Sequence, residues 1–298
     1  MRQFIINGQK IKNGLIIIDG KDFRYLRQVL RVKLGDMISV RLESGELEQA
    51  TVARVDEKAR VVVLQICAGA GFGSGLGAGT SGARGAGAAG GVSGAEAGTI
   101  TRGVQAGELD SVGSNAPEFW LFQFITKPQK FELIVRQATE CGVRKIIPVK
   151  GEFSEKSSIM ALEGGGAKRE RLERIIREAR QQSGSPVNTE VTEPMTLEAA
   201  IELWNADASE VGKGEKQAFV LYERTERTVD LHETIAQAGK ENIKKVCVAC
   251  GCEGGISPSE IEILCEKGLF HPIHFAVNIL RAETAALYGI AAVQSAIL

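Results

Sequence analysis

The chain has 298 residues, a hydrophobic content of 44% and a formal net charge of −1 at pH 7. This length suits one large domain or two ordinary ones, and the balanced charge excludes a protein that binds nucleic acid through its overall charge. The charge is unevenly spread: residues 1–67 carry twelve Lys or Arg against eight Asp or Glu, whereas residues 116–298 carry 22 against 26. A mildly basic N-terminal part is compatible with RNA binding.

The N-terminus, MRQFIING, lacks the apolar run of a signal peptide, and no stretch of the sequence is long and apolar enough to span a membrane. Most of the six cysteines stand in apolar runs, where free cysteine behaves as a small hydrophobic residue. We therefore expect a protein of the reducing cytoplasm with no membrane segment.

Residues 1–67 have a mainly β pattern. Short apolar runs at 15–18, 37–42, 49–55 and 60–66 predict strands, and residues 22–30 predict a short helix. Several short strands in so few residues favour a small barrel. Arg24, Arg27 and Arg31 lie on or beside the helix, where they form either a solvated polar face or a patch that contacts phosphates.

Residues 68–115 break this pattern, because sixteen of these 48 residues are glycine and almost none is a bulky apolar residue. Such a segment cannot bury enough surface to offset the entropy lost on ordering, so we expect a disordered insertion or linker. Its glycines do not form a phosphate-binding loop, since no predicted strand precedes them and no predicted helix follows.

From residue 116 onward, apolar strands alternate with amphipathic helices. Strands are expected at 119–125, 143–149, 218–222, 245–250 and 273–277, and helices at 128–141, 167–182, 231–238, 258–268 and 283–297. Residues 246–250 are entirely apolar, which is typical of a parallel strand buried on both faces. The alternation predicts a parallel sheet with helices on both faces.

Two unusual loops follow strands at the same expected end of this sheet. Residues 251–255, GCEGG, lead into a helix start with Ser257 at the N-cap, Pro258 at N1 and Glu260 at N3. The glycines let a backbone approach a ligand closely, so this loop is either a small-molecule site or a tight strand-to-helix turn. In the second loop, residues 278–285, Arg281 and Glu283 either stabilise the next helix and pair with each other or meet a substrate.

Metal and hydrolase chemistry have little support in the sequence. Cys247 and Cys250 form a C-x-x-C motif, but in a strand these positions point to opposite faces, and no second cysteine pair follows at zinc-ribbon spacing. The three histidines are too scattered for a metal site or a catalytic triad, and there is no G-x-S-x-G motif. We expect no metal site.

The two loops resemble those of the RsmE-type 16S rRNA (uracil-N3) methyltransferases of the SPOUT superfamily. Residues 251–260, GCEGGISPSE, are similar to the family's G-P-E-G-G loop and its F/I-S/T-P-x-E helix start. Residues 275–285, FAVNILRAETA, are similar to its L-G-x-R-I-L-R-x-E-T-A motif. Lys127 and the runs 29–31, 35–36, 139–143 and 179–183 add to a resemblance that covers nearly the whole chain except 68–115.

The resemblance implies an α/β fold, in which residues 116–298 form a SPOUT-type knotted parallel-sheet methyltransferase domain with a C-terminal trefoil knot. It implies a small PUA-like, RNA-binding β-barrel at residues 1–67, with residues 68–115 between the two domains. The cofactor would be S-adenosyl-L-methionine, and the reaction would be methylation of N3 of a uridine in 16S rRNA of the small ribosomal subunit. The family works as a homodimer.

The resemblance also implies roles for single residues. Arg281 would stabilise charge that develops on the uracil carbonyls, and Glu253 or Glu283 would accept the proton of N3, so Arg281 and Glu283 are the expected catalytic residues. The expected RNA-binding residues are Arg2, Arg24, Arg27, Arg31 and Lys127. The expected cofactor-binding residues are Leu221, Gly251, Glu253, Gly254, Gly255, Phe275, Ala276, Ile279, Leu280 and Thr284.

The sequence departs from the family pattern at Cys252, where the family has Pro, at Phe275-Ala276, where it has Leu-Gly, and at Asn278, where it has Arg. The added methyl group of Ala276 would require a small shift near the cofactor, and losing the arginine at 278 would weaken RNA contact. Two other functions therefore stay open: a non-catalytic RNA-binding or ribosome-assembly factor on the same fold, and a SPOUT ribose 2′-O-methyltransferase.

Overall fold

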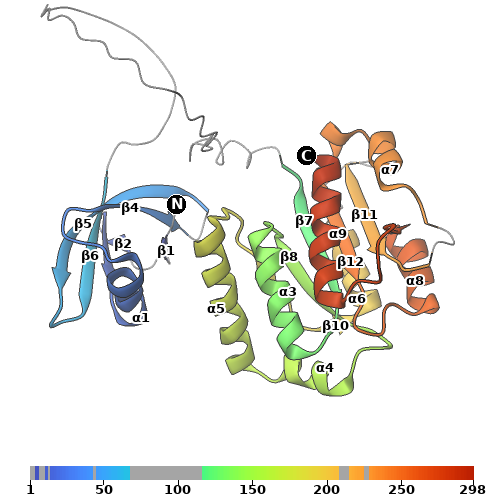
Figure 1. Ribbon diagram of the computed structural model, residues 1–298, viewed down its shortest axis with the longest axis horizontal. Coiled ribbons are helices and arrows are strands. Elements are labelled where there is room, and N and C mark those ends of the chain that lie inside the picture. Colours follow the sequence, from blue (N-terminus) through green and yellow to red (C-terminus); the bar gives the residue numbers. More distant parts are fainter. Residues whose placement is uncertain are drawn as a thin grey trace, which may run out of the picture.

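The computed structural model describes residues 4–6, 11–12, 14–42, 45–67, 116–207, 215–224 and 228–298. The expected insertion 68–115 and the expected RNA-binding residue Arg2 lie outside these ranges. The described residues form a curled N-terminal sheet and a larger part in which helices cover a second sheet (Figure 1).

The N-terminal sheet has six strands in the order β1-β4-β5-β6-β3-β2. Alternate residues of β3 are buried, namely Ile16 and Ile18, so one face of this strand carries the core. Helix α1 (Gly20–Arg24) and the π-helical segment η2 (Tyr25–Leu30) add Phe23 and Leu26 to this core. The strands are β1 Phe4–Ile6, β2 Ile11–Lys12, β3 Leu15–Ile18, β4 Met37–Leu42, β5 Leu47–Asp56 and β6 Val61–Ile66.

The four strands and the helical segment that the sequence predicts for this part are present, whereas β1 and β2 were not predicted. These two strands have three and two residues, too few for a periodic pattern to show in the sequence. The sheet curls into a half-barrel, which agrees with the PUA-like barrel implied by the resemblance.

The second sheet is parallel throughout, with strand order β10-β8-β7-β12-β11-β13, and β9 pairs with β8. The residues of its central strand β12 alternate between two cores: Val246, Val248 and Cys250 face one, Cys247 and Ala249 the other. The predicted parallel sheet is therefore confirmed. The strands are β7 Glu118–Phe124, β8 Lys145–Lys150, β9 Glu190–Val191, β10 Met195–Thr196, β11 Lys216–Leu221, β12 Lys245–Cys250 and β13 His271–Ile273.

Helices cover both faces of this sheet, as the sequence predicted. Helices α3, α5, α7 and α9 contribute to the core on one face, and α6 and α8 to the core on the other. The sequence predicted neither α4 nor α6. The helices are α3 Pro128–Glu140, α4 Lys156–Glu163, α5 Gly166–Ser183, α6 Leu197–Asp207, α7 Leu231–Ala238, α8 Pro258–Gly268 and α9 Ala282–Ile297, with a short 3₁₀ turn, η4, at Lys240–Asn242.

The last strand was predicted wrongly. It covers His271–Ile273 instead of 273–277, because β13 pairs only with the final three residues of β11, from Phe219 to Leu221. Beyond Ile273 no neighbouring strand continues the pairing, so the apolar residues from Phe275 onward leave the sheet. The error has a functional consequence, since the freed residues belong to the loop that leads into α9.

Helix α8 begins with the predicted capping box. The Ser257 hydroxyl accepts a hydrogen bond from the Glu260 N–H, and the Glu260 carboxylate accepts one from the Ser257 N–H at 2.9 Å. The second carboxylate oxygen of Glu260 accepts from the N–H of Glu152, in the loop after β8, at 2.7 Å. Glu260 is buried, so it fixes both the helix start and the neighbouring loop.

We expect Glu260→Gln to lower the free energy of unfolding by about 2 kcal/mol, because an amide presents only one oxygen to the two N–H donors that the buried carboxylate accepts from. Ser257→Ala removes one capping bond and should cost about 1 kcal/mol. Urea unfolding of both variants measures the two losses. Equal stability of Glu260→Gln and the unaltered protein would contradict this role.

Candidate functional site

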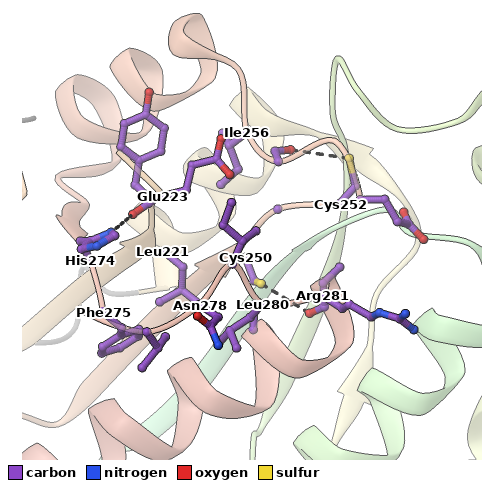
Figure 2. A pocket seen from close by; sticks show the side chains of 18 of the residues that line it. Leu221, Glu223, Cys250, Cys252, Ile256, His274, Phe275, Asn278, Leu280 and Arg281 are labelled. Carbon is purple, nitrogen blue, oxygen red and sulfur yellow. Dashed lines mark hydrogen bonds between the residues drawn. The ribbon is translucent and has the colours of Figure 1, made fainter. Parts of the chain in front are cut away.

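The carboxyl ends of the parallel strands meet at one edge of the sheet, where the chain segments after β11, β12 and β13 surround a cavity of about 410 Å³ (Figure 2). This volume lies in the range of small-molecule sites. The two loops that the sequence singled out therefore do lie together. In Figure 2, His274 lies at one end of the site and Arg281 at the other, and Leu221, Cys250 and Leu280 lie between them.

The cavity collects most, but not all, of the residues expected to bind the cofactor. Gly254, Ala276 and Thr284 are not among the residues that line it. Of the two expected catalytic residues, Arg281 lines the cavity and Glu283 does not. The expected cofactor-binding residues that do line it are Leu221, Gly251, Glu253, Gly255, Phe275, Ile279 and Leu280.

Sequence reasoning missed several lining residues. Tyr222 and Glu223 come from the end of β11, His274 follows β13, and Lys130 lies in the first turn of α3. A position directly after a parallel strand was the available signal for Tyr222 and Glu223, since ligands bind at that edge. Nothing in the local sequence singles out Lys130, because its role depends on two carboxylates far along the chain.

The glycine loop is a tight turn in which each glycine has a distinct steric reason. Gly255 has φ +81°, its N–H donates to the carbonyl of Cys252 at 3.0 Å, and no atom lies within 4 Å of the position where its Cβ would be. A Cβ on Gly251 would lie 2.8 Å from the backbone carbon of Gly255. A Cβ on Gly254 would lie 2.8 Å from the Cβ of Phe153. Thus Gly251 and Gly254 permit close packing, whereas Gly255 borders open space at the cavity.

Gln123, a buried residue of β7, holds the start of this loop. Its amide nitrogen donates to the carbonyls of Gly251 at 3.1 Å and of Phe124 at 2.9 Å. Buried hydrogen bonds of this kind fix a backbone that has left the regular sheet pairing. The neighbouring strand β7 therefore fixes the start of the loop after β12.

Lys130 joins the two loops. Its ammonium lies 3.4 Å from the carboxylate of Glu253 in the glycine loop and 3.3 Å from that of Glu283 at the start of α9. Glu253 also accepts a hydrogen bond from the N–H of Lys127 at 3.2 Å. This cation therefore connects α3, the glycine loop and the closing helix at one side of the cavity.

The charges of this cluster stabilise each other. Burial lowers the pKa of Lys130, but hydrogen bonds to Glu283 and Glu253 outweigh it, so the pKa is raised above 10.5. Burial raises the pKa of Glu283, but its own N–H, Lys130 and Arg281 together hold the pKa below 4.5. The ion pair between Lys130 and Glu283 is lost only when the pH falls through the lowered pKa of Glu283 or rises through the raised pKa of Lys130. Both groups therefore stay ionised at neutral pH.

The second loop presents side chains with little cover. Ile279 is 88% exposed, and Arg281 is exposed at the N-cap position of α9. Phe275 packs edge-on against Tyr288 of α9 with 5.0 Å between ring centroids, and His274 Nδ1 lies 3.3 Å from the Tyr222 carbonyl. The loop thus offers an apolar surface and a guanidinium to a ligand.

The cysteines near the site are buried. Cys250 and Cys252 line the cavity, and burial raises the pKa of Cys250 to about 12 and also raises that of Cys252. Their thiols are therefore protonated and poorly nucleophilic at neutral pH. Among the described residues, no group of three or more His, Cys, Asp or Glu side chains is arranged to hold a metal ion.

Of the residues expected to bind RNA, the four that the structure describes do not line this cavity. Arg24 and Arg31 are exposed, whereas Arg27 pairs with Glu57 at 2.5 Å and donates to the Val32 carbonyl. Lys127, at the start of α3, pairs with Glu155 at 3.3 Å. In the described part of the chain, no helix has the length and apolar composition needed to cross a membrane.

Comparisons with known proteins point to one family. Residues 114–294 match the family described as RNA methyltransferase domain. The ribosomal RNA small subunit methyltransferase E 2 of Borreliella burgdorferi is 23% identical over 98% of this chain and 96% of its own length. The ribosomal RNA small subunit methyltransferase E of Aquifex aeolicus is 31% identical, over 56% of this chain and 64% of its own length.

A solved structure has a similar fold. It is that of the ribosomal RNA small subunit methyltransferase E of Neisseria gonorrhoeae, bound to S-adenosyl methionine. Its sequence is 18% identical, its TM-score is 0.67, and the match covers 99% of this chain and 97% of that one.

Proposed function

Because the chain belongs to the RNA methyltransferase domain family, we propose that it methylates N3 of a uridine in 16S rRNA of the small ribosomal subunit, with S-adenosylmethionine as methyl donor. The observation that carries the proposal is that the glycine loop and the loop before α9 line one cavity, with Gly255 and Arg281 on its walls. The similar proteins of Borreliella and Aquifex bear the name of a small-subunit rRNA methyltransferase, which supports the substrate.

The residues of the cavity fit this cofactor. Leu221, Ile256 and Leu280 provide apolar walls for a flat ring, and the open space at Gly255 allows a ligand to approach the backbone. Glu223 and Glu253 bring carboxylates to a site that would hold a cationic ligand. S-adenosylmethionine would supply an activated methyl group. The residues proposed to bind the cofactor also include Gly251, Phe275 and Ile279. Gly254, Ala276 and Thr284 do not line the cavity, and we propose that they support the two loops.

The side chains of this chain would contribute position and charge. Arg281 lines the cavity at the N-cap of α9. We propose that its guanidinium stabilises the negative charge that develops on the uracil carbonyls as N3 loses its proton. Glu283 has a lowered pKa, so it is ionised and can accept the N3 proton only weakly. Its ion pair with Lys130 gives it a second role, which is to hold α9 against the glycine loop.

We expect Lys130→Met to lower kcat/KM about tenfold, because two carboxylates would face each other without their shared cation and the loops would separate. Lys130→Arg keeps the charge and should retain most of the activity. Steady-state methylation assays measure both variants. If Lys130→Met matched the unaltered enzyme while Lys130→Arg did not, the ion-pair role would be wrong.

Further properties belong to the same proposal. Residues 1–67 would form an RNA-binding domain, 68–115 a linker and 116–298 the methyltransferase domain. The strand order, with β12 between β7 and β11 and β13 beyond them, is compatible with a trefoil knot. Exposed Val277, Ile279 and Tyr288 beside the cavity support a homodimer in which the partner covers them. We also propose that the protein acts in the cytoplasm, where its ribosomal substrate would be found.

A non-catalytic RNA-binding or assembly factor is the alternative that Ala276 and Asn278 favour. Ala276 lies outside the cavity lining, so its methyl group need not obstruct a ligand, whereas Asn278 lines it. Calorimetry with S-adenosylmethionine separates the two functions. We expect micromolar binding, and no heat of binding at millimolar cofactor would exclude the enzyme.

A ribose 2′-O-methyltransferase is the second alternative. Mass spectrometry of rRNA nucleosides from a deletion strain distinguishes the two chemistries. Loss of N3-methyluridine is expected, and loss of a 2′-O-methylated nucleoside instead would favour the alternative.

A further inference from the structure

A second concave surface lies between the N-terminal sheet and helix α5. It encloses about 1170 Å³ and is lined from both parts of the chain, by Ile5 and Lys21 on one side and by much of α5 on the other. In Figure 1, α5 is the helix of the larger part that lies nearest to the N-terminal sheet. We call this surface the α5 groove.

The α5 groove is basic although the chain is not. Eight lysines and arginines line it against four glutamates, whereas the whole chain has a net charge of −1. Its walls are joined by an ion pair between Arg177 of α5 and Asp22 of α1 at 2.7 Å. Gly45 of the N-terminal sheet also lies so close to the Pro186 carbonyl that a Cβ would be 2.8 Å from it. These contacts join the two walls of the groove, and three carboxylates that do not line it, Asp22, Glu132 and Glu178, pair with cations that do.

Two arginines of the groove can exchange their partners at little cost. The side chain of Arg169 is 72% exposed and lies 3.2 Å from Glu173 and 3.9 Å from Glu193, and that of Arg174 is 57% exposed and lies 3.9 Å from Glu178. Exposed ion pairs four residues apart on a helix stabilise it only weakly, so a phosphate can replace the carboxylate. A guanidinium binds phosphate with two parallel hydrogen bonds.

The α5 groove borders the first turns of helix α3. Lys168 and Arg171, which line the groove, bind the two oxygens of Glu132 at 2.8 and 2.7 Å. Glu132 follows Lys130 by two residues in the first turns of α3, and Lys130 lines the cavity. Side chains two residues apart on a helix point to different sides, so the groove and the cavity border the first turns of α3 from two sides.

We propose that the α5 groove binds the phosphodiester backbone of the rRNA. The identification of the bound polyanion as rRNA rests on the proposed function. The proposal assigns RNA contact to Arg169 and Arg174 of the methyltransferase part. Phosphate contacts of this kind position RNA without reading its sequence.

The test is the salt dependence of binding to a transcript of the 3′ region of 16S rRNA, measured by fluorescence anisotropy. Arg169→Gln/Arg174→Gln should weaken binding about tenfold near 0.1 M salt and lower the slope of log K against log salt by about 1.5. Arg169→Lys/Arg174→Lys should keep the slope. Arg136→Gln/Lys240→Gln removes two exposed charges outside both concave surfaces and is the matched control.

An unchanged S-adenosylmethionine affinity would show that the glutamine variant is folded. If the unaltered protein methylates rRNA but the glutamine variant keeps its affinity and slope, the groove inference is overturned and the proposed function stands. If the control weakens binding as much as the glutamine variant, the groove inference is also overturned, because overall charge would explain the effect. If the unaltered protein neither binds nor methylates rRNA, the proposed function fails.

Discussion

We expect Gly255→Val to abolish S-adenosylmethionine binding, with an affinity loss of at least about 100-fold. At Gly255 the chain has φ +81° and no atom lies within 4 Å of the missing Cβ, so a branched side chain would occupy the cavity itself. The same φ is strained for any β-branched residue, so the turn would also tend to open. Isothermal titration calorimetry measures the loss.

Gly35→Val is the matched control for this variant. Gly35 has φ +85°, and its Cβ position is equally open, but it lies in the turn before β4 and does not line the cavity. Both variants should lose similar stability from the backbone strain, on the order of 1–2 kcal/mol. Only Gly255→Val should lose the cofactor. Equal cofactor affinity in the two variants would mean that the glycine loop is a structural turn alone.

Arg281→Ala should lower kcat about 100-fold and leave S-adenosylmethionine affinity within about threefold. The reason is that removing one donor that stabilises transition-state charge costs about 100-fold or more. The side chain of Arg281 makes no capping hydrogen bond to α9, so its removal should not unfold the helix. Single-turnover methylation of small ribosomal subunits measures the chemical step directly.

The companion variant Arg281→Lys separates charge from geometry. A lysine retains the positive charge but not the planar pair of donors, so we expect partial activity between those of Arg281 and Ala. Arg136→Ala, an exposed arginine of α3 outside the cavity, should behave as the unaltered enzyme. A kcat of Arg281→Ala close to that of Arg136→Ala would exclude Arg281 from the reaction.

The sequence predicted the elements that have strong local patterns. The apolar run of β12, the capping box at Ser257 and the glycine loop were all visible, because each depends on residues close together in the chain. The position of β13 was not, because its length is set by the end of β11, some fifty residues earlier. That error concealed only that the chain leaves the sheet after Ile273, since the resemblance had already assigned Phe275, Ile279 and Leu280 to the cofactor.

The site was predictable in part for the same reason. The two loops carry motifs that resemble a known family, and the structure brings them to one cavity. Lys130 was not predictable, because its meaning comes from Glu253 and Glu283, which lie more than 120 residues further along the chain. The α5 groove was likewise hidden, since alternating charges on a helix do not reveal which face meets the N-terminal sheet.

The most direct test is to incubate the purified protein with unmethylated small ribosomal subunits and S-adenosylmethionine, and to analyse the rRNA nucleosides by mass spectrometry. The account predicts one N3-methyluridine per 16S rRNA, absent when Gly255→Val replaces the unaltered protein. A chain that binds the cofactor yet leaves every uridine unmethylated at N3, or that methylates a ribose instead, would contradict it.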